Sequence, residues 1–255
     1  MSQGAVSELW EDLLEKEEAY FPKDDKLLFF RRILSSRWVS SLLKYGVRKR
    51  YLEAGCGLGR FGIAIASTGK EVTLLDCSEK SLRGAKCLKD IAEKHFGKMN
   101  VNFMKGDLES VNTEGRQFDV TFNEGVLEHW TGRDQRVAVI RKMADMTNIG
   151  GLISVRVVNN KNPLYNFLYL AALKDTIPVY HRYDLKELEG EMKAAGLRIV
   201  CSDGETVNDP GDWVKSKWLA GVLMFFSILI NKLPRPLRKS LCPSIFCIGV
   251  VEQLS

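Results

Sequence analysis

Three features are missing from this sequence, and each absence excludes a class of protein. No basic segment followed by an apolar run opens the chain, so we expect no secretory signal. The six cysteines have irregular spacing, which predicts reduced thiols in a cytoplasmic protein and not a disulfide framework. Cys242 and Cys247 have no matching pair of Cys or His ligands, so we expect no zinc site.

The chain also lacks an apolar run long enough to cross a membrane. Residues 218–230 are apolar on every face, but a membrane-spanning helix needs about 20 such residues. This run lies in a segment, 213–243, with six basic residues and no acidic one, whereas the rest of the chain carries 31 basic and 32 acidic residues. Because the positive charge gathers beside a hydrophobic run and not along a stripe with exposed aromatics, we expect no nucleic-acid partner.

Short apolar runs alternate with segments of helical periodicity, which is typical of a parallel sheet covered by helices. The sequence therefore predicts an α/β fold with a doubly wound, seven-stranded, mostly parallel sheet. We expect strands over residues 50–55, 71–76, 101–106, 118–123, 150–157, 197–203 and 244–251. We expect four parts: a helical N-terminal segment (1–45), the core (46–203), an inserted helical, hydrophobic cap (204–243) and a last core strand (244–255).

Two helices are predicted with both of their ends. Ser78 is a typical N-cap and Gly97 a stop signal for the helix after the second strand. Asp184 and Glu187 have the spacing of a capping box, and Gly196 ends the helix that follows them. Both helices carry an apolar stripe that predicts packing on the sheet.

The most informative stretch is 51–59, an apolar strand that contains Glu53 and runs into alternate glycines. Glycines at these positions let the main chain approach a ligand closely at the C-terminal edge of a sheet, as in nucleoside cofactor sites. The acid at Glu53 favours a cationic ligand. A nicotinamide fingerprint would need another glycine where this chain has Arg60, so that fingerprint is broken.

Five segments in order give the chain its resemblance to a family: 52–59, 71–76, 102–108, 118–130 and 148–155. In these segments the sequence resembles the class I S-adenosylmethionine-dependent methyltransferases, over about residues 50–203 with a return at 244–251. The resemblance implies a Rossmann-like methyltransferase fold, S-adenosylmethionine (SAM) as cofactor, and direct displacement of a methyl group from a sulfonium.

The resemblance also implies which residues hold the cofactor. The glycine turn would wrap the methionine part, Asp76 would accept hydrogen bonds from the ribose, and Asp107 would accept the adenine amino group. For Asp76 the alternative is an acid that merely starts the helix at Ser78. The full set of expected cofactor contacts is Glu53, Gly55, Cys56, Gly57, Gly59, Asp76, Cys77, Asp107, Leu108, Asn123 and Glu124.

The loop after the fourth strand supplies the candidate catalytic residues. Unperturbed imidazole titrates near neutrality, so His129 is the candidate general base, with Glu128 orienting it. The alternative is that both residues only bridge the loop. A metal-binding Glu-x-x-Glu-His motif of related methyltransferases has Gly125 in place of its first acid here, so we expect no metal. The expected acceptor contacts are Trp130, Tyr180, His181 and Arg182.

These observations predict a methyltransferase that acts on a small, hydrophobic or lipid-like acceptor. Segment 213–243 has three alternatives: a lid over that acceptor, a peripheral membrane contact, or an oligomer interface. The expected location is cytoplasmic, peripheral to a membrane in the second case. Two rival functions stay open, an NAD(P)-dependent oxidoreductase and a catalytically silent membrane- or partner-binding module.

Overall fold

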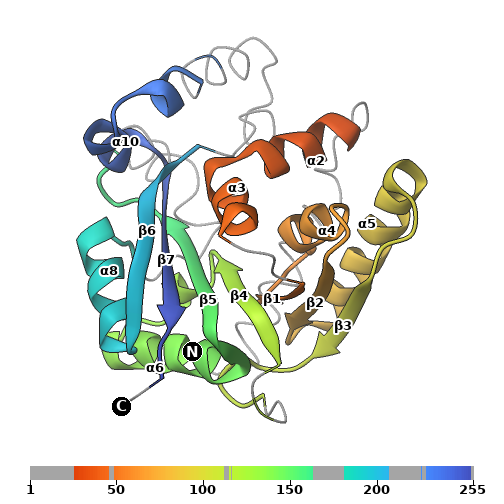
Figure 1. The fold of residues 1–255 in the computed structure, drawn as a ribbon, viewed down its shortest axis with the longest axis horizontal. Coiled ribbons are helices and arrows are strands. Elements are labelled where there is room, and N and C mark those ends of the chain that lie inside the picture. Colours follow the sequence, from red (N-terminus) through yellow and green to blue (C-terminus); the bar gives the residue numbers. More distant parts are fainter. Residues whose placement is uncertain are drawn as a thin grey trace.

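The computed structural model describes residues 26–45, 49–111, 115, 117–162, 181–206, 225 and 228–253. Seven strands form one sheet in the order β3-β2-β1-β4-β5-β7-β6 (Figure 1). The strands are β1 (Arg50–Ala54), β2 (Glu71–Asp76), β3 (Val101–Lys105), β4 (Phe118–Glu124), β5 (Thr147–Val158), β6 (Leu197–Glu205) and β7 (Ser244–Val251).

The connectivity confirms the doubly wound arrangement. The strands β3, β2, β1, β4 and β5 are parallel to their neighbours, and β7 pairs antiparallel with both β5 and β6. The chain builds the sheet outward from β1 to β3 and then returns to place β4 on the other side of β1. Ligands bind such sheets in the crevice where the winding reverses, at the carboxyl ends of the strands.

Helices cover both faces of the sheet. They are α2 (Lys26–Ser35), α3 (Arg37–Lys44), α4 (Arg60–Ala66), α5 (Glu79–Phe96), α6 (Arg133–Met146), α8 (Leu185–Ala194) and α10 (Arg235–Leu241), with a short 3₁₀ turn η2 (Leu127–His129). The predicted helix starts are confirmed: Ser78 Oγ accepts the Ser81 amide before α5, and Asp184 Oδ1 accepts the Lys186 and Glu187 amides before α8.

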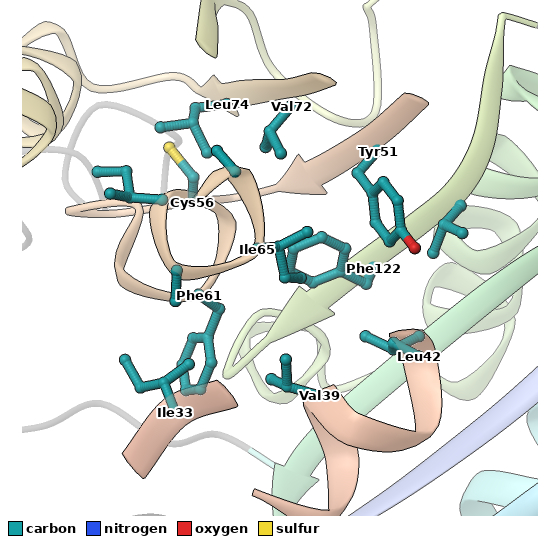
Figure 2. Close-up of a cluster of buried hydrophobic side chains, with 14 of the residues drawn as sticks. Ile33, Val39, Leu42, Tyr51, Cys56, Phe61, Ile65, Val72, Leu74 and Phe122 are labelled. Atoms are coloured by element: carbon teal, nitrogen blue, oxygen red, sulfur yellow. The ribbon is translucent and has the colours of Figure 1, made fainter. Parts of the chain in front are cut away.

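Strand periodicity divides the core into two clusters. Tyr51, Val72 and Phe122 face the cluster formed with α2, α3, α4 and α5, whereas Leu52 and Ile153 face the cluster formed with α6 and α8. Figure 2 shows the first cluster, with side chains of α2 and α3 packed beside those of α4, β1 and β4. Alternate residues of each strand thus fill opposite cores, as the period of two requires.

Two strands are longer than predicted. Strand β5 begins at Thr147, three residues before the predicted start. Its pairing with β4 shifts from Phe118↔Thr147 to Val120↔Leu152, so Gly150 and Gly151 lie at a bulge inside the strand. Gly150 supplies the positive φ, 74°, at this bulge. Strand β6 continues to Glu205 because Glu205 pairs with Ser244. The first two residues of the predicted cap therefore belong to a strand.

The N-terminal helices are fastened to the sheet by a carboxylate from β6. Glu205 accepts the backbone amides of Arg37 and Trp38 at the start of α3. The Trp38 ring packs edge-on against Phe61, 5.0 Å between centroids, and against Phe122, 5.8 Å. Residues 1–25 of the expected N-terminal segment and 207–224 of the expected cap lie outside the described residues. In the described part of the chain, no helix is long and apolar enough to cross a membrane.

We predict that Gly62→Ala destabilises the fold. A Cβ at this position would lie 2.5 Å from Leu74 Cδ2 and 2.6 Å from Glu53 Oε2, and overpacking of this kind costs roughly 1 to 3 kcal/mol. In α8, Gly190 has nothing within 4 Å of such a Cβ, so Gly190→Ala should stabilise by about 0.5 to 1 kcal/mol. Urea unfolding of both variants measures the difference, and equal midpoints would contradict the packing around Gly62.

Candidate active site

A glycine turn joins β1 to α4 at the switch point of the sheet. Gly55, Gly57 and Gly59 have φ angles of 73°, 52° and 67°, a region that residues with a Cβ rarely adopt. The amides of Gly55 and Cys56 both donate to the Leu75 carbonyl of β2, at 2.8 and 2.9 Å. A Cβ on Gly57 would meet nothing within 4 Å, so the main chain here borders open space. The turn is therefore shaped for contact with a ligand by its backbone.

Glu53 fastens β1 to the start of α4. Its side chain is buried, and Oε2 accepts the Gly62 amide at 2.8 Å. Burial raises the pKa of this carboxyl to about 8, against an ordinary value of 4.5. The contact holds the glycine turn between two rigid elements.

Asp76 joins the end of β2 to the same turn. Oδ2 accepts the Gly57 amide at 2.8 Å, and Oδ1 accepts the Ser78 amide at 2.9 Å. Burial raises its pKa above the usual range. Since Ser78 itself is the N-cap of α5, Asp76 stands just before the helix and faces the glycine turn.

The loop after β3, which contains Asp107, lies beside the end of β2. The Gly106 amide donates to the Asp76 carbonyl at 3.0 Å, and the Asp107 carboxylate accepts the Glu109 amide at 2.8 Å. Leu108 is buried in the core on the α6 side. The two neighbouring cysteines differ, because Cys56 is buried and Cys77 is exposed. The loops after β1, β2 and β3 thus meet at one edge of the sheet.

The last two side chains of β4, Asn123 and Glu124, contact different elements. Asn123 is fully buried, and Nδ2 donates to Met143 Sδ of α6 at 3.4 Å. Glu124 forms an ion pair with Arg156 of β5. The next residue, Gly125, donates its amide to the Arg156 carbonyl at 3.1 Å.

Arg156 is a residue of this site that sequence reasoning missed. Its side chain is 1% exposed, and the guanidinium lies 5.7 Å from the Trp38 ring centroid and 5.6 Å from that of Phe61. Its position in the sequence could have indicated this role, because an arginine inside an apolar strand is rarely buried without a charged partner. Its partner Glu124 is the last residue of β4, so Arg156 links the end of this strand to α3 and α4.

Glu128 lies in the η2 turn and joins this turn to the end of β5 and to His181. Oε1 accepts the Val158 amide at 2.8 Å, and the backbone carbonyl accepts the His181 amide at 3.0 Å. Burial raises the pKa of this carboxyl to about 7. Among the described residues, Oε2 has no hydrogen-bond partner although it is buried. His129, the next residue, is partly exposed.

A buried group of polar side chains holds the loop that follows η2, at residues 130 and 131. Arg136 of α6 binds the Glu191 carboxylate of α8 and donates to the carbonyls of Trp130 and Thr131. Tyr183 donates to Glu191 at 2.8 Å. This cluster could not be predicted from the sequence, because Arg136 lies 55 positions from Glu191 along the chain. It determines where the expected acceptor contacts sit.

The expected acceptor contacts themselves are only partly described. Trp130 Nε1 donates to Glu109 at 2.7 Å, and His181 Nε2 lies 2.8 Å from Glu187 Oε1. Arg182 is partly exposed, and Tyr180 lies outside the described residues. No group of three or more His, Cys, Asp or Glu side chains within the described ranges is arranged to hold a metal ion.

We predict that Glu53→Gln flattens the pH dependence of stability. The folded state keeps the Glu53 proton up to a pKa of about 8, whereas the unfolded state loses it near 4.5. Stability should therefore fall as the pH rises between these values, by up to about 1.4 kcal/mol per pH unit for one proton. Gln keeps an acceptor for Gly62 and removes this proton. Urea unfolding from pH 5 to 9 should show the flatter slope.

The control for this experiment is Asp145→Asn, which neutralises an exposed acid on α6. Its slope should match that of the unmodified chain. If Glu53→Gln also keeps the full slope, Glu53 is not the group that holds the proton.

Comparisons with known proteins agree with this geometry. A family model described as "Methyltransferase domain" matches residues 52–151, the stretch from β1 into β5. The ubiquinone biosynthesis O-methyltransferase of Shewanella halifaxensis is 30% identical over 163 residues, which cover 61% of this chain and 65% of that protein. Those of Azoarcus sp. and Coxiella burnetii are 28% and 29% identical, over 63% and 49% of this chain. The chain spans 69% and 50% of the lengths of these two relatives.

Solved structures share the fold. Magnesium protoporphyrin IX methyltransferase from Synechocystis, solved with bound SAH, has a TM-score of 0.64 and 16% identity, covering 98% of this chain and 99% of that one. A possible histamine N-methyltransferase from Thermotoga maritima has a TM-score of 0.62 and 14% identity, covering 96% and 99%. These comparisons favour the methyltransferase over the nicotinamide oxidoreductase. Residues 52–151 therefore match a methyltransferase domain, and the chain has the fold of solved SAM-dependent methyltransferases.

Proposed function

We propose that this methyltransferase methylates a hydroxyl oxygen of a small apolar acceptor, with SAM as methyl donor. The observation that carries the proposal is the contact between Asp76 and Gly57, which places a strand-end carboxylate beside a glycine turn that borders open space. The relatives named O-methyltransferases support oxygen as the nucleophile, and their role in ubiquinone biosynthesis supports an apolar acceptor.

The residues around the glycine turn fit the cofactor. Gly55, Cys56, Gly57 and Gly59 would surround its methionine part, where backbone groups can come close. The Asp76 carboxyl accepts the amides of Gly57 and Ser78 and also bonds the Ser81 side chain and the Cys77 amide. It would accept the ribose hydroxyls from the side that faces the glycine turn. Asp107 and Leu108 would meet the adenine, because Gly106 is tied to Asp76.

The chain's contribution to the reaction is mainly alignment. When bound, SAM supplies an electrophilic methyl group on a sulfonium. Glu124, held by Arg156, would border the reacting end, and Trp130, His181 and Arg182 would border the acceptor. Holding two reactants in line and excluding water lowers a barrier by roughly 7 to 11 kcal/mol at best. The ion pair of Arg156 with Glu124 and that of Arg136 with Glu191 would provide this rigidity.

A hydroxyl acceptor must also lose its proton, and His129 is the proposed base. It follows Glu128 on η2, the short turn that comes two residues after the end of β4. Glu128 fixes this turn through Val158 and His181, so it would position His129. Imidazole is the side chain most often used to accept a proton near neutral pH.

We predict that Asp76→Asn weakens binding of S-adenosylhomocysteine. The amide offers one acceptor in place of a charged carboxylate, and losing a charged hydrogen-bond partner costs roughly 1 to 3 kcal/mol. Isothermal titration calorimetry measures the change, with Asp90→Asn, an exposed acid on α5, as the matched control. Equal affinity in both variants would refute the ribose assignment.

We predict that His129→Ala lowers turnover by about 10² to 10⁴ while the affinity for S-adenosylhomocysteine stays unchanged. The assay follows labelled methyl from SAM into an organic extract, with phenols and catechols that carry alkyl tails as acceptors. His95→Ala, an exposed histidine on α5, is the control and should keep full activity. A fully active His129→Ala variant would exclude His129 as the base.

A further inference from the structure

An exposed apolar patch lies next to α10 and has no role in the proposed reaction. Seven large hydrophobic side chains are exposed among the described residues, and four of them fall between positions 225 and 237. They are Phe225, Ile228, Leu229 and Leu237, with exposed fractions of 59%, 47%, 43% and 49%. Residues 225 and 228–232 are helical, and the spacing of the first three side chains is that of one helix face. We call this set the 225–239 surface, together with the basic residues between 232 and 239.

The charge of this surface has one sign. Lys232, Arg235, Arg238 and Lys239 lie within it, and positions 225–243 contain no acidic residue. Arg238 is neutralised by Asp203, but Arg235 donates to the Ser202 carbonyl, an uncharged partner. In the described part of the chain, Lys232 and Lys239 form no ion pair. Three positive charges thus remain available beside the apolar side chains.

The surface is held rigidly on the sheet. The Asn159 amide donates to the carbonyls of Lys239 and Cys242, and Asn162 donates to Leu241. Gly204 packs so closely that a Cβ there would lie 2.3 Å from the Arg238 carbonyl. On the other side, Arg37 donates to the Asn231 carbonyl at 2.9 Å. Exposure of the apolar side chains is therefore a property of an anchored element.

The position of the surface relates it to the active site. Ser244 pairs with Val158 at the end of β5 and with Glu205 at the end of β6. The segment before Ser244 therefore lies at the carboxyl edge of the parallel strands, the edge that holds the glycine turn. Figure 1 shows α10 beyond this end of β6 and β7.

From these observations we propose that the 225–239 surface binds an anionic lipid bilayer at its interface. The apolar side chains would enter the boundary between headgroups and acyl chains, and the basic side chains would contact the headgroups. A second copy of the chain fits less well, because a symmetric contact would bring the same positive charges together. A closed lid would bury these side chains, and they are about half exposed. The proposal goes beyond the proposed reaction, and no acceptor is needed to test it.

The test is co-sedimentation of the full chain with vesicles. We expect binding to vesicles of phosphatidylglycerol and phosphatidylcholine in equal parts and weaker binding to vesicles of phosphatidylcholine alone. At high salt the binding to the two kinds of vesicle should become equal, because salt screens the charges. Ile228→Asp with Leu237→Asp should weaken binding on the order of tenfold or more. Ile149→Asp is the matched control, since Ile149 is 52% exposed at the opposite edge of the sheet, and it should bind as the unmodified chain does.

Charge reversal tests the second half of the surface. Lys232→Glu with Lys239→Glu should remove the preference for anionic vesicles, whereas Lys98→Glu, an exposed lysine after α5, should leave it unchanged. Unchanged affinity for S-adenosylhomocysteine confirms that each variant is folded. No binding by the unmodified chain, or equal loss in the test and control variants, overturns the proposal.

Two further outcomes are distinct. If light scattering without vesicles shows a dimer that Ile228→Asp dissolves, the surface belongs to a second copy and the proposal fails. If vesicles bind as expected but no hydroxyl acceptor is methylated, only the proposed acceptor chemistry fails.

Discussion

Buried carboxylates that accept backbone amides hold together the edge of the sheet that carries the candidate active site. Helix starts, turns and one strand end at this edge have N–H groups without a backbone acceptor, and a buried amide without an acceptor costs free energy. Four acids satisfy them, one near the end of each of β1, β2 and β6 and one after β4. The pairs are Glu53 with Gly62, Asp76 with Gly57 and Ser78, Glu128 with Val158, and Glu205 with Arg37 and Trp38.

Burial changes the protonation of these carboxyl groups. Burial raises the pKa of Glu53 to about 8 and of Glu128 to about 7, because the charged form loses its hydration. The fold therefore keeps protons on acids that would be charged in water, and it loses stability as the pH rises toward the raised pKa values. Arg156 shows the same constraint with the opposite sign, since its buried charge is matched by Glu124 and by two aromatic rings.

The same edge carries the elements that surround the site. Glu205 anchors α3, and Asn159 and Asn162 anchor the segment before β7. All three hydrogen bonds join residues more than 75 positions apart in sequence. The proposed bilayer surface and the proposed acceptor pocket are thus supported by one rigid frame. An apolar acceptor that partitions into a bilayer would reach this edge without crossing bulk water.

The sequence by itself determined the seven strands, both capped helices and the glycine turn, because period and cap chemistry are local properties of the chain. It also placed Glu53, Asp76 and Asp107 at strand ends, where parallel strands bring them to one edge. It could not indicate that Arg156 pairs with Glu124, that Arg136 joins Glu191 and Tyr183, or that Glu205 caps α3. Only the tertiary structure decided these contacts, because a buried charge selects its partner by proximity in space, and the sequence gives no distance between strands that meet through the fold.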